Sequence, residues 1–413
     1  MITLNTIFDG TVTLNEYLQV RKHRSDTTDY LSLYNSEISK RLGVKYAYSF
    51  GSGRGALYAL LKCLRIGEGD EVIIQGYTCV AVPKAIMYAG AKPIYADISL
   101  DDYSMTLDSM KKVFTDCTRA VIIQHTYGIP CRSTEEIYSF CHDRDIVVIE
   151  DCAHTFGGKY KGRFLGTIGD AGFFSTDHSK YISTSVGGIA ITDNELLGEK
   201  LKDFYDHTSS LTDTETDAVM YQLRDGLIWS NKFINRIVKL NKYTNMLFGR
   251  IRRIMERKHS AYSLDDYDNY TWPDYSFPAK LSDLQALLGL SQLERFQDIY
   301  NHRKDITAIY NMYLKEEFSN TVDCDAPLMY PIMVDDPEHY VRKLKGCVEV
   351  SRWFKNEILC IDREEYPNVF FDPAGCPNAS YAASRIINLP NHSKVSMAEA
   401  RKISLRILKV RVS

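Results

Sequence analysis

Short runs of apolar residues alternate with stretches of helical spacing between about residues 45 and 195. Because strands that are apolar on both faces and alternate with helices belong to parallel sheets, this pattern predicts an α/β fold. We expect a large domain with a mostly parallel sheet and helices on both of its faces. The runs that carry the prediction are EVIIQ at 71–75, KPIYADI at 92–98, RAVIIQHT at 119–126 and DIVVIED at 145–151, with helical stretches at 54–66 and 133–144, a further strand at 188–195 and a helix at 195–207.

The alternation stops at about residue 208 and does not return before 272. Within this interval, residues 231–258 place apolar side chains at helical spacing and carry nine Lys or Arg against one Glu. Two interpretations stay open for this basic amphipathic helix. It is a lid or dimer-interface helix with a buried apolar face, or it lies on anionic lipid or cradles a lipid-linked or polyanionic substrate.

The remainder of the chain begins with a helix-rich stretch, 280–318, and continues with mixed short strands and helices. A chain of 413 residues is too long for one small core, so we expect a large and a smaller lobe. The predicted division is an N-terminal segment at 1–30, a large domain at 31–207, a basic helical insertion at 208–272, and a linking helix with a smaller C-terminal α+β domain at 273–413.

Net charge, cysteine spacing and the lengths of the apolar runs argue against several classes of protein. The net charge of -3 gives no reason to expect a nucleic-acid partner. The ten cysteines form no CxxC pair and no Cys/His group with zinc spacing, so no metal site is predicted. The first ten residues lack the basic and apolar regions of a signal peptide, and no apolar run approaches the roughly 20 residues of a membrane span. We therefore predict a cytoplasmic protein with reduced thiols.

A glycine-rich turn, Gly51-Ser52-Gly53-Arg54-Gly55, opens the helical stretch at 54–66. Free backbone N–H groups and the positive end of a helix dipole make such a turn suitable for binding an anion. A plain helix-entry loop remains the alternative.

Polar residues follow two of the predicted strands, at the sheet edge where α/β folds place ligands. Asp151 ends the strand at 145–151, with His154 close behind. Its carboxylate suits a protonated ring nitrogen or a metal, and a helix cap or strand-end salt bridge is the alternative. His125 and Tyr127 follow the strand at 119–126, where either contacts a ligand or fills the strand end.

Lys180 lies in the sequence FFSTDHSKYISTSVGG, at 173–188, among serines and threonines. A lysine amine is too basic to react at neutral pH unless its environment changes it, so a solvated surface lysine is the default alternative. Hydroxyl groups can hold a phosphate, and Gly187-Gly188 lets the backbone approach a ligand closely. An anion loop, a strand-end carboxylate and a lysine match the needs of pyridoxal phosphate: a phosphate cradle, a partner for its ring nitrogen and an amine.

These motifs resemble the DegT/DnrJ/EryC1/StrS family of sugar aminotransferases, which have fold type I and use pyridoxal phosphate. The resemblance runs from about residue 45 to the end, interrupted at 208–272. Its most specific parts are GEGDEVIIQGYTCVAVPKAIMYAGAKPIYADI, IEDCAHTFGGKYKGRFLGTIGDAGFFSTDHSK, DLQALLGLSQLERFQDIYNHR and ASRIINLPNH.

The resemblance implies a role for each matching position. Lys180 forms the Schiff base and shuttles the proton, and Asp151 keeps the pyridine nitrogen protonated. His154, where the family usually has Gln, lies near the 3-hydroxyl of the cofactor. Ser175 contacts the phosphate together with the backbone N–H groups from Gly53 to Gly55.

Besides His154, four further positions depart from the family pattern. Arg54 replaces a phosphate-binding Thr, and arginine can bind phosphate bidentately. Cys79 occupies a position where many members stack an aromatic ring on the cofactor. Pro278 and Lys280 stand where the partner subunit's phosphate-binding Asn and the following Arg are usual, so the contact across a homodimer is in question. The retained Lys180 argues against the family's dehydratase branch.

The resemblance implies amino transfer, with glutamate as the expected donor, to a keto group on a nucleotide-linked sugar. Such a reaction serves surface polysaccharide or natural-product biosynthesis, and the enzyme is expected to be a homodimer. Two alternatives remain: a transferase that acts on a non-sugar or lipid-linked ketone, and a relative that binds the cofactor without turnover.

Overall fold

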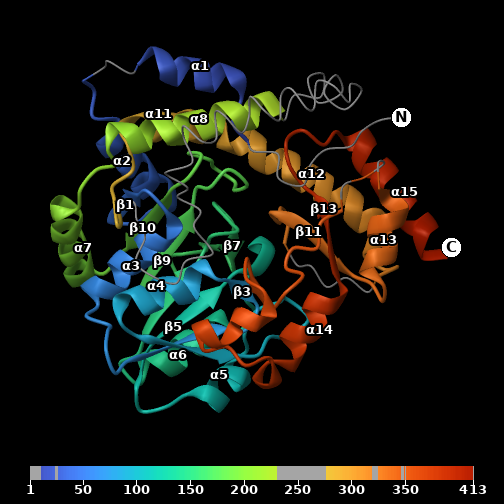
Figure 1. Ribbon diagram of the computed structural model, residues 1–413, viewed down its shortest axis with the longest axis horizontal. Coiled ribbons are helices and arrows are strands. Elements are labelled where there is room, and N and C mark those ends of the chain that lie inside the picture. The colour runs from blue at the N-terminus through green and yellow to red at the C-terminus, as the bar shows by residue number, and fades with distance from the viewer. Residues whose placement is uncertain are drawn as a thin grey trace.

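The computed structural model describes residues 11–23, 27–229, 276–318, 324–345, 348 and 350–412 (Figure 1). Its centre is a seven-stranded sheet with the order β1-β10-β9-β6-β5-β2-β4. β10 runs antiparallel to both of its neighbours, and the four remaining strand pairs are parallel. The strands, in this order, are Tyr46–Phe50, Gly188–Thr192, Ala171–Ser175, Val147–Asp151, Thr118–Gln124, Glu71–Gln75 and Lys92–Ala96.

Helices cover both faces of this sheet, as the sequence predicts. α3, α4 and α7 pack on one side, where α3 contacts β1, β9 and β10. α5, α6, α2 and α11 contribute to the hydrophobic clusters of the other side. The predicted α/β class is therefore confirmed. The helices are α2 Tyr30–Leu42, α3 Gly53–Cys63, α4 Ala81–Ala89, α5 Leu107–Val113, α6 Thr134–His142, α7 Glu195–His207 and α11 Asp283–Glu294.

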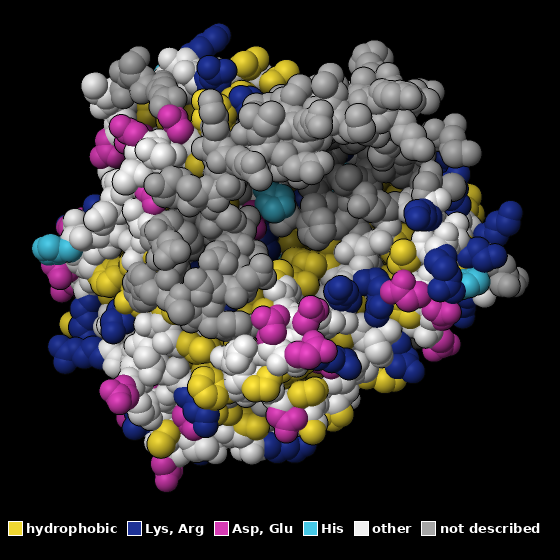
Figure 2. Space-filling view, in the orientation of Figure 1, with side chains coloured by type: hydrophobic (Ala, Val, Ile, Leu, Met, Phe, Trp, Pro, Cys, Tyr) yellow, Lys and Arg dark blue, Asp and Glu magenta, His cyan; other side chains and the backbone are white. Residues whose placement is uncertain are grey.

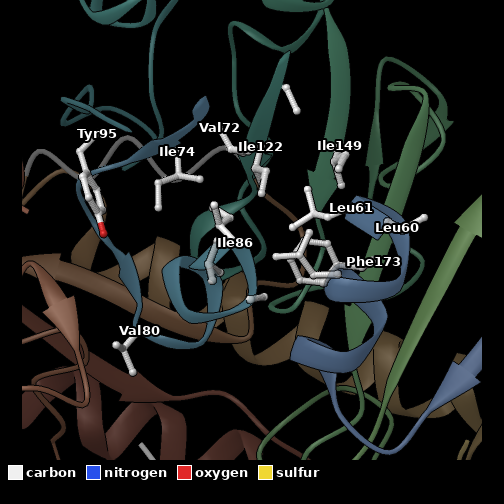
Figure 3. Close-up of a cluster of buried hydrophobic side chains, with 14 of the residues drawn as sticks. Leu60, Leu61, Val72, Ile74, Val80, Ile86, Tyr95, Ile122, Ile149 and Phe173 are labelled. Carbon is white, nitrogen blue, oxygen red and sulfur yellow. The ribbon is translucent and has the colours of Figure 1, made fainter. Parts of the chain in front are cut away.

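The alternation of side chains along the strands explains why each strand is apolar throughout. On β10, Ala190 faces the largest hydrophobic cluster, whereas Ile189 and Ile191 face the cluster on the opposite side. Successive side chains of a strand point to opposite faces, so a sheet covered on both faces needs apolar residues at every position. Figure 3 shows the largest cluster, with Leu60 and Leu61 of α3 and Ile86 of α4 packed on Ile122 and Ile149.

The ends of the predicted strands shift for local reasons. The strand predicted at 145–151 begins at Val147, since Asp145 has a φ of 55° and cannot continue a strand. The strand predicted at 188–195 ends at Thr192, because the Asn194 side chain accepts a hydrogen bond from the backbone N–H of Leu197 and caps α7. The helical stretch at 280–318 is two helices, α11 and α12, that meet at Arg295.

The C-terminal elements form two groups in Figure 1. One group surrounds the antiparallel pair β11–β13 and has its own hydrophobic cluster. The other includes α14 and joins the main cluster, and its short strand β12 pairs in parallel with β3. The elements are α12 Phe296–Leu314, β11 Met329–Met333, α13 Pro337–Leu344, β12 Ile358–Leu359, α14 Pro377–Arg385, β13 Ile386–Pro390, α15 Met397–Val412 and, from the large sheet side, β3 Thr78–Cys79.

The remaining described elements are short or lie at the edge. α1 (Leu14–Lys22) packs against α11 and α8 (Asp213–Trp229), and Figure 1 shows all three together at one end of the molecule. α8 belongs to the predicted insertion, whereas the basic stretch 231–258 lies outside the described residues. The hairpin strands are β7 Lys159–Tyr160 and β8 Arg163–Phe164, and the 3-10 helices are η1 Thr126–Gly128, η2 Arg363–Val369 and η3 Pro373–Gly375.

Candidate active site

A cavity of about 250 Å³ lies where the carboxyl ends of β5, β6 and β9 meet the N-terminus of α3. Figure 2 shows a hollow near the centre of one face of the molecule, with hydrophobic side chains inside it. The cavity brings together residues that are 127 positions apart in the chain, from Gly53 to Lys180. The predicted site residues that line it are Gly53, Arg54, Cys79, Asp151, His154, Ser175 and Lys180.

Asp151 ends β6 and directs a buried carboxyl group to the cavity, with an exposed fraction of only 3%. One carboxyl oxygen accepts a hydrogen bond of 2.9 Å from the backbone N–H of Ala153, and the other accepts none from the described residues. Burial raises the pKa of Asp151 to about 6, although the nearby Lys180 and His125 act in the opposite direction. A cationic N–H group placed in the cavity would therefore find a carboxylate that lacks a partner.

Lys180 extends into the same cavity from the loop that follows β9. Its side chain is 9% exposed, and its Nζ lies 5.1 Å from the centre of the Trp353 ring. No hydrogen bond from Nζ to another described residue is present. Burial lowers the pKa of Lys180, and the charges of Asp177 and Asp151 oppose that shift only in part. The environment thus increases the share of the neutral amine, which is the nucleophilic form.

His154 is neutral and has a defined tautomer. Its Nδ1 accepts a hydrogen bond of 3.1 Å from the backbone N–H of Tyr127, so Nε2 carries the proton. Burial and the charge of Lys180 hold the pKa of His154 well below its usual range. The ring packs against Trp353, with ring centres 4.6 Å apart. His154 therefore offers an N–H donor at the cavity and carries no charge.

The N-terminus of α3 lies at the cavity, where the glycine-rich turn predicts an anion site. Ser52 caps the helix, and its Oγ accepts a hydrogen bond of 3.0 Å from the backbone N–H of Gly55. Gly55 does not line the cavity and its N–H donates to the cap, so phosphate binding by this N–H stays a prediction that the structure does not support. Gly53 and the buried Arg54 do line it, at the positive end of the helix dipole.

Only part of the hydroxyl cluster faces the cavity. Ser175 and Ser179 line it, but Thr176 and Thr184 hydrogen-bond to each other at 2.7 Å. Thr184 also donates to the carbonyl of Val186 at 2.9 Å. Phosphate binding by the hydroxyl groups therefore stays a prediction for Ser175 and Ser179, whereas Thr176 and Thr184 stabilise the loop between Lys180 and β10.

Gly188 lets β10 lie directly against the start of α3. A Cβ atom at Gly188 would lie 2.5 Å from both Cα and N of Gly53 and from the carbonyl oxygen of Ser52. All three are backbone atoms, so no side-chain rotation can relieve the contact. The glycine is required by close backbone packing beside the anion site, not by a turn.

We expect Gly188→Ala to move the N-terminus of α3 away from β10. The substitution should lower the free energy of unfolding by about 1–3 kcal/mol, as overpacking does, and weaken pyridoxal phosphate binding. Thermal denaturation and a cofactor titration measure the two effects. Gly51→Ala is the matched control, since the nearest atom to its Cβ lies 3.6 Å away. Equal behaviour of the two variants would contradict this account of the anion site.

Behind Asp151 lies a buried network around Glu150, whose side chain points away from the cavity. Its carboxylate accepts hydrogen bonds from the backbone N–H groups of Gly166, Ile168 and Gly169, and from His125 Nε2 at 2.9 Å. Burial alone would raise the pKa of Glu150, but these donors outweigh it and lower the pKa.

The potential metal ligands of His125, Glu150 and Cys152 all lie within 4.8 Å of one another. The Glu150 oxygens are already occupied by four donors, and His125 Nδ1 accepts a further bond of 3.1 Å from the backbone N–H of Cys131. His125 and Tyr127 are fully buried and do not line the cavity. Of the two interpretations of these residues, strand-end packing is the one that their positions support.

Glu150→Gln should destabilise the fold by about 3 kcal/mol, because an amide replaces a charged acceptor of several N–H groups. The NH₂ group would also face a backbone donor. Chemical denaturation measures the change, with Glu135→Gln as the control, since Glu135 is exposed and pairs with Lys161 on the surface. If both substitutions lower the free energy of unfolding by the same amount, the network around Glu150 is not a determinant of stability.

Several residues that line the cavity carry no signal that sequence reasoning detected. Gln124, the last residue of β5, fixes the β3 segment through its bonds to Thr78 and to the carbonyl of Tyr77. Trp353 and Cys360 reach the cavity from the C-terminal half. The position of Gln124 at a strand end is a usable signal, whereas the other two lie in a segment without periodicity.

The segment around Pro278 and Lys280 lies beside β1 and α7 of its own chain. Backbone hydrogen bonds join Gly51 to Ala279 at 2.8 Å and Lys280 to Ser209 at 2.8 Å. The Lys280 ammonium lies 5.0 Å from the centre of the Tyr205 ring. Neither Pro278 nor Lys280 lines the cavity of this chain.

A comparison of the sequence with known protein families identifies the class of protein to which this cavity belongs. The model of the DegT/DnrJ/EryC1/StrS aminotransferase family matches residues 13–225 and 244–407. The chain belongs to this family. Membership confirms the predicted enzyme class, an aminotransferase that depends on pyridoxal phosphate.

Curated relatives support this membership at two levels of coverage. An uncharacterized protein of Methanocaldococcus jannaschii is 27% identical over 94% of this chain and 92% of its own length. The spore coat polysaccharide biosynthesis protein SpsC of Bacillus subtilis is 26% identical over 88% of this chain and 85% of its own. GDP-perosamine synthase of Escherichia coli is 36% identical, but the match spans 44% of this chain and 49% of that enzyme.

Solved structures share the fold of the whole chain. The aminotransferase from Psychrobacter cryohalolentis has a TM-score of 0.72 and 22% identity, with 97% of this chain and 98% of that chain covered. PseC of Helicobacter pylori, an aminotransferase in pseudaminic acid biosynthesis, has a TM-score of 0.72 and 17% identity, with 98% of each chain covered. At these identities the similarity concerns the fold alone.

The residues of the cavity fit pyridoxal phosphate. Asp151 offers a buried carboxyl oxygen without a partner, which suits a protonated ring nitrogen. Arg54, Ser175 and the first turn of α3 also line the cavity and offer donors and positive charge, which suits a phosphate. Lys180 offers a desolvated amine at the same cavity. The chemical needs of the cofactor are thus met by side chains that are present.

Proposed function

We propose that this enzyme transfers an amino group from glutamate to a keto group on a nucleotide-linked sugar. The observation that carries the proposal is that the Lys180 amine and the Asp151 carboxyl face one cavity beside the N-terminus of α3. The names of two relatives support the substrate class: GDP-perosamine synthase, and UDP-N-acetyl-3-dehydro-alpha-D-glucosamine 3-aminotransferase of Acidithiobacillus ferrooxidans. Those two matches span 49% and 47% of the relatives' lengths.

In this proposal Asp151, Ser175, Arg54, Gly53 and His154 hold the cofactor. When bound, pyridoxal phosphate withdraws electrons from the carbon that carries the donor's amine and so makes its hydrogen acidic. The Asp151 carboxylate stabilises a proton on the ring nitrogen, and the Arg54 guanidinium neutralises phosphate charge. The Nε2–H of His154 is the donor available to the cofactor's 3-hydroxyl. Cys79 lies at the position where many members of the family stack an aromatic ring.

Lys180 acts as the general base and acid. Its Nζ accepts the proton from the α-carbon of glutamate, and in the second half of the reaction it returns a proton to the sugar carbon that receives the amine. Burial lowers the pKa of Lys180, so the neutral form that accepts a proton is more accessible at neutral pH. Trp353 covers the amine and limits the access of water.

The direct test supplies purified enzyme with glutamate and soluble GDP-linked or UDP-linked keto-sugars. We expect release of 2-oxoglutarate that depends on the sugar, with an amino-sugar product of matching amount by mass spectrometry. Release of 2-oxoglutarate without any aminated sugar across such a panel would contradict the proposed substrate class. It would leave the aminotransferase chemistry intact.

The enzyme is also proposed to work as a homodimer in the cytoplasm. Leu14 and Leu18 lie four residues apart on α1, on one face, and are 61% and 46% exposed, which suits a covered interface. No disulfide joins the nine cysteines of the described residues, which suits a reducing compartment. Light scattering after size-exclusion chromatography, with Leu18→Glu beside the wild type, measures the oligomer; a monomeric wild type would contradict the dimer.

No helix among the described residues is long and apolar enough to cross a membrane. Contact between the segment 231–258 and anionic lipid remains a prediction, because the segment lies outside the described residues. Sedimentation with vesicles of anionic and of neutral lipid at low salt distinguishes the two interpretations of this segment. Absence of binding to either kind of vesicle would leave the lid or dimer-interface role.

A further inference from the structure

Two cysteines from distant parts of the chain meet at the cavity of Lys180. Cys79 is the last residue of β3, and Cys360 directly follows the last residue of β12. β3 and β12 pair in parallel with Leu359 opposite Cys79, and both cysteines line the cavity. This pairing places two thiols, 281 residues apart in the chain, at one site.

The backbone holds the two cysteine segments together. The N–H of Thr78 donates to the carbonyl of Glu357 at 3.0 Å, and the N–H of Val80 donates to the carbonyl of Leu359 at 3.1 Å. Cys79, in β3, and Cys360, directly after β12, therefore belong to segments whose relative position is set by backbone hydrogen bonds. A disulfide requires that two cysteines already lie in such proximity.

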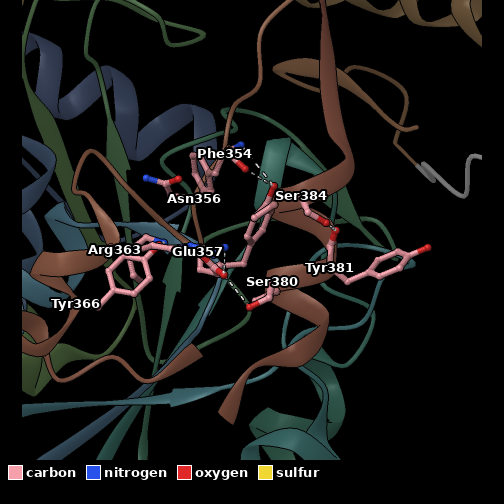
Figure 4. A network of polar contacts seen from close by, with 12 residues as sticks. Phe354, Asn356, Glu357, Arg363, Tyr366, Ser380, Tyr381 and Ser384 are labelled. Atoms are coloured by element: carbon pink, nitrogen blue, oxygen red, sulfur yellow. Dashed lines mark hydrogen bonds and ion pairs between the residues drawn. The ribbon is translucent and has the colours of Figure 1, made fainter. Parts of the chain in front are cut away.

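A buried polar network fixes the segment that carries Cys360. The Glu357 carboxylate is fully buried and accepts hydrogen bonds from Ser380 at 2.7 Å, Tyr366 at 2.8 Å and Arg363 at 2.8 Å. Figure 4 shows these three side chains converging on Glu357 from η2 and α14. The network fixes Glu357, three residues before Cys360, in addition to the backbone bonds to β3.

The two thiols contact each other and differ from the other cysteines. The Cys79 and Cys360 thiols share a hydrogen bond, which lowers the pKa of Cys79, and Lys180 and Arg54 act in the same direction. Cys360 is exposed, so a small oxidant can reach the pair. By contrast, burial raises the pKa of the thiols at Cys63, Cys131, Cys141, Cys152 and Cys376.

We infer that Cys79 and Cys360 form a reversible disulfide when the enzyme meets a hydroperoxide. The Cys79 thiolate attacks one peroxide oxygen, the O–O bond breaks, and the leaving hydroxide takes a proton to become water. The Cys360 sulfur then attacks the Cys79 sulfenic acid, an S–S bond forms, and the departing hydroxide takes the Cys360 proton. The peroxide gains two electrons, and the two sulfurs together lose two.

The disulfide alters the catalytic cavity because both cysteines are part of its lining, together with Lys180 and Trp353. Formation of an S–S bond draws the two side chains together and changes the shape of the wall near Trp353, whose ring centre lies 5.1 Å from Lys180 Nζ. Oxidation therefore reduces turnover, and a dithiol reductant restores it. The pair links activity to the redox state of the compartment.

The test treats the cofactor-loaded enzyme with hydrogen peroxide, blocks free thiols, and maps peptides by mass spectrometry without reduction. We expect one linked pair of peptides that contain Cys79 and Cys360, with a mass lower by two hydrogens, and its loss after dithiothreitol. The link should be absent from Cys79→Ser and Cys360→Ser. It should persist in Cys117→Ser, which removes an exposed thiol outside the cavity.

The linked peptide is measured independently of activity, so this inference can fail while the proposed function stands, and the reverse. Separate oxidation of the two cysteines without a link would overturn the inference. So would a link from either cysteine to another partner. A link that forms but leaves the turnover of the wild type unchanged would overturn the regulatory consequence, and reductant-reversible loss of turnover in the wild type and Cys117→Ser alone would support it.

Discussion

Lys180→Ala should abolish catalysis while leaving the fold and the cofactor contacts at Asp151 and α3 in place. Removal of a general acid–base group by itself lowers the rate by about 10²–10⁴-fold. The substitution also removes the amine that engages the cofactor, which lowers the rate further. We therefore expect turnover with glutamate and a keto-sugar to fall by at least about 10⁴-fold. A coupled assay for 2-oxoglutarate, with circular dichroism to verify the fold, measures the effect.

Small primary amines provide a sharper readout of this substitution. If Lys180 acts through its amine, ethylamine added to Lys180→Ala should restore part of the lost activity, because the cavity left by the side chain admits it. Lys202→Ala is the matched control, since Lys202 is exposed and pairs with Asp206 on α7. If the Lys180→Ala enzyme keeps more than about a tenth of the wild-type activity, Lys180 is not the general base.

Asp151→Asn should have the second largest effect on turnover. It should lower the turnover of the cofactor-loaded enzyme, and it should raise the stability of the cofactor-free protein. With the cofactor bound, the substitution breaks a buried ion pair, which costs about 3–5 kcal/mol. Expressed as a rate, this loss is about 10²–10⁴-fold. The amide oxygen can still accept the hydrogen bond from Ala153, so the position of the strand end should persist.

Without the cofactor, Asp151→Asn should make the protein more stable at neutral pH. Burial raises the pKa of Asp151 from 3.8 to about 6, so above about pH 6 the folded wild type carries an ionised, desolvated carboxylate, and its stability is lower by the full cost of that ionisation. The wild type is relieved of this cost when Asp151 is protonated, below about pH 4. The advantage of the variant should therefore reach about 3 kcal/mol above pH 6 and disappear as the pH falls from 6 to 4.

Urea denaturation of both proteins without cofactor, from pH 4 to 8, measures this difference. Asp325→Asn is the control, because Asp325 is exposed and pairs with Lys304 on the surface. A variant that is less stable than the wild type at pH 7 would contradict the desolvated state of Asp151. Unchanged turnover of the variant would contradict its pairing with the cofactor.

The large sheet, and Asp151 and Lys180 as candidate site residues, can be predicted from the sequence. Strands buried on both faces are continuous apolar runs, so the end of the run at Asp151 marks the sheet edge where ligands bind. Lys180 alone has no such signal; it becomes specific only together with Asp151 and the glycine-rich turn before α3.

The remainder of the site depends on contacts that no local pattern encodes. The role of Gly55 is set by the Ser52 cap, which consumes its N–H, and an anion loop and a capped helix start look alike in sequence. Thr176 and Thr184 bond to each other only because β9 and β10 bring them together. Trp353 reaches Lys180 across 173 residues, through tertiary packing of the C-terminal segment.

The departures from the family pattern acquire a place in the structure. Arg54 is buried at the start of α3, where a guanidinium can balance a phosphate. Cys79 lies beside Cys360 at the cavity, so a second thiol, from the C-terminal segment, accompanies this departure from the family pattern.

The most direct test of the central claim is the absorbance spectrum of purified wild type and Lys180→Ala after saturation with pyridoxal phosphate and removal of the excess. The account predicts a visible band of the cofactor bound to the wild type, which glutamate removes as 2-oxoglutarate appears in equal amount. Lys180→Ala should retain cofactor but release no 2-oxoglutarate when glutamate is added. A wild type that retains no cofactor, or whose spectrum glutamate leaves unchanged, would contradict the account.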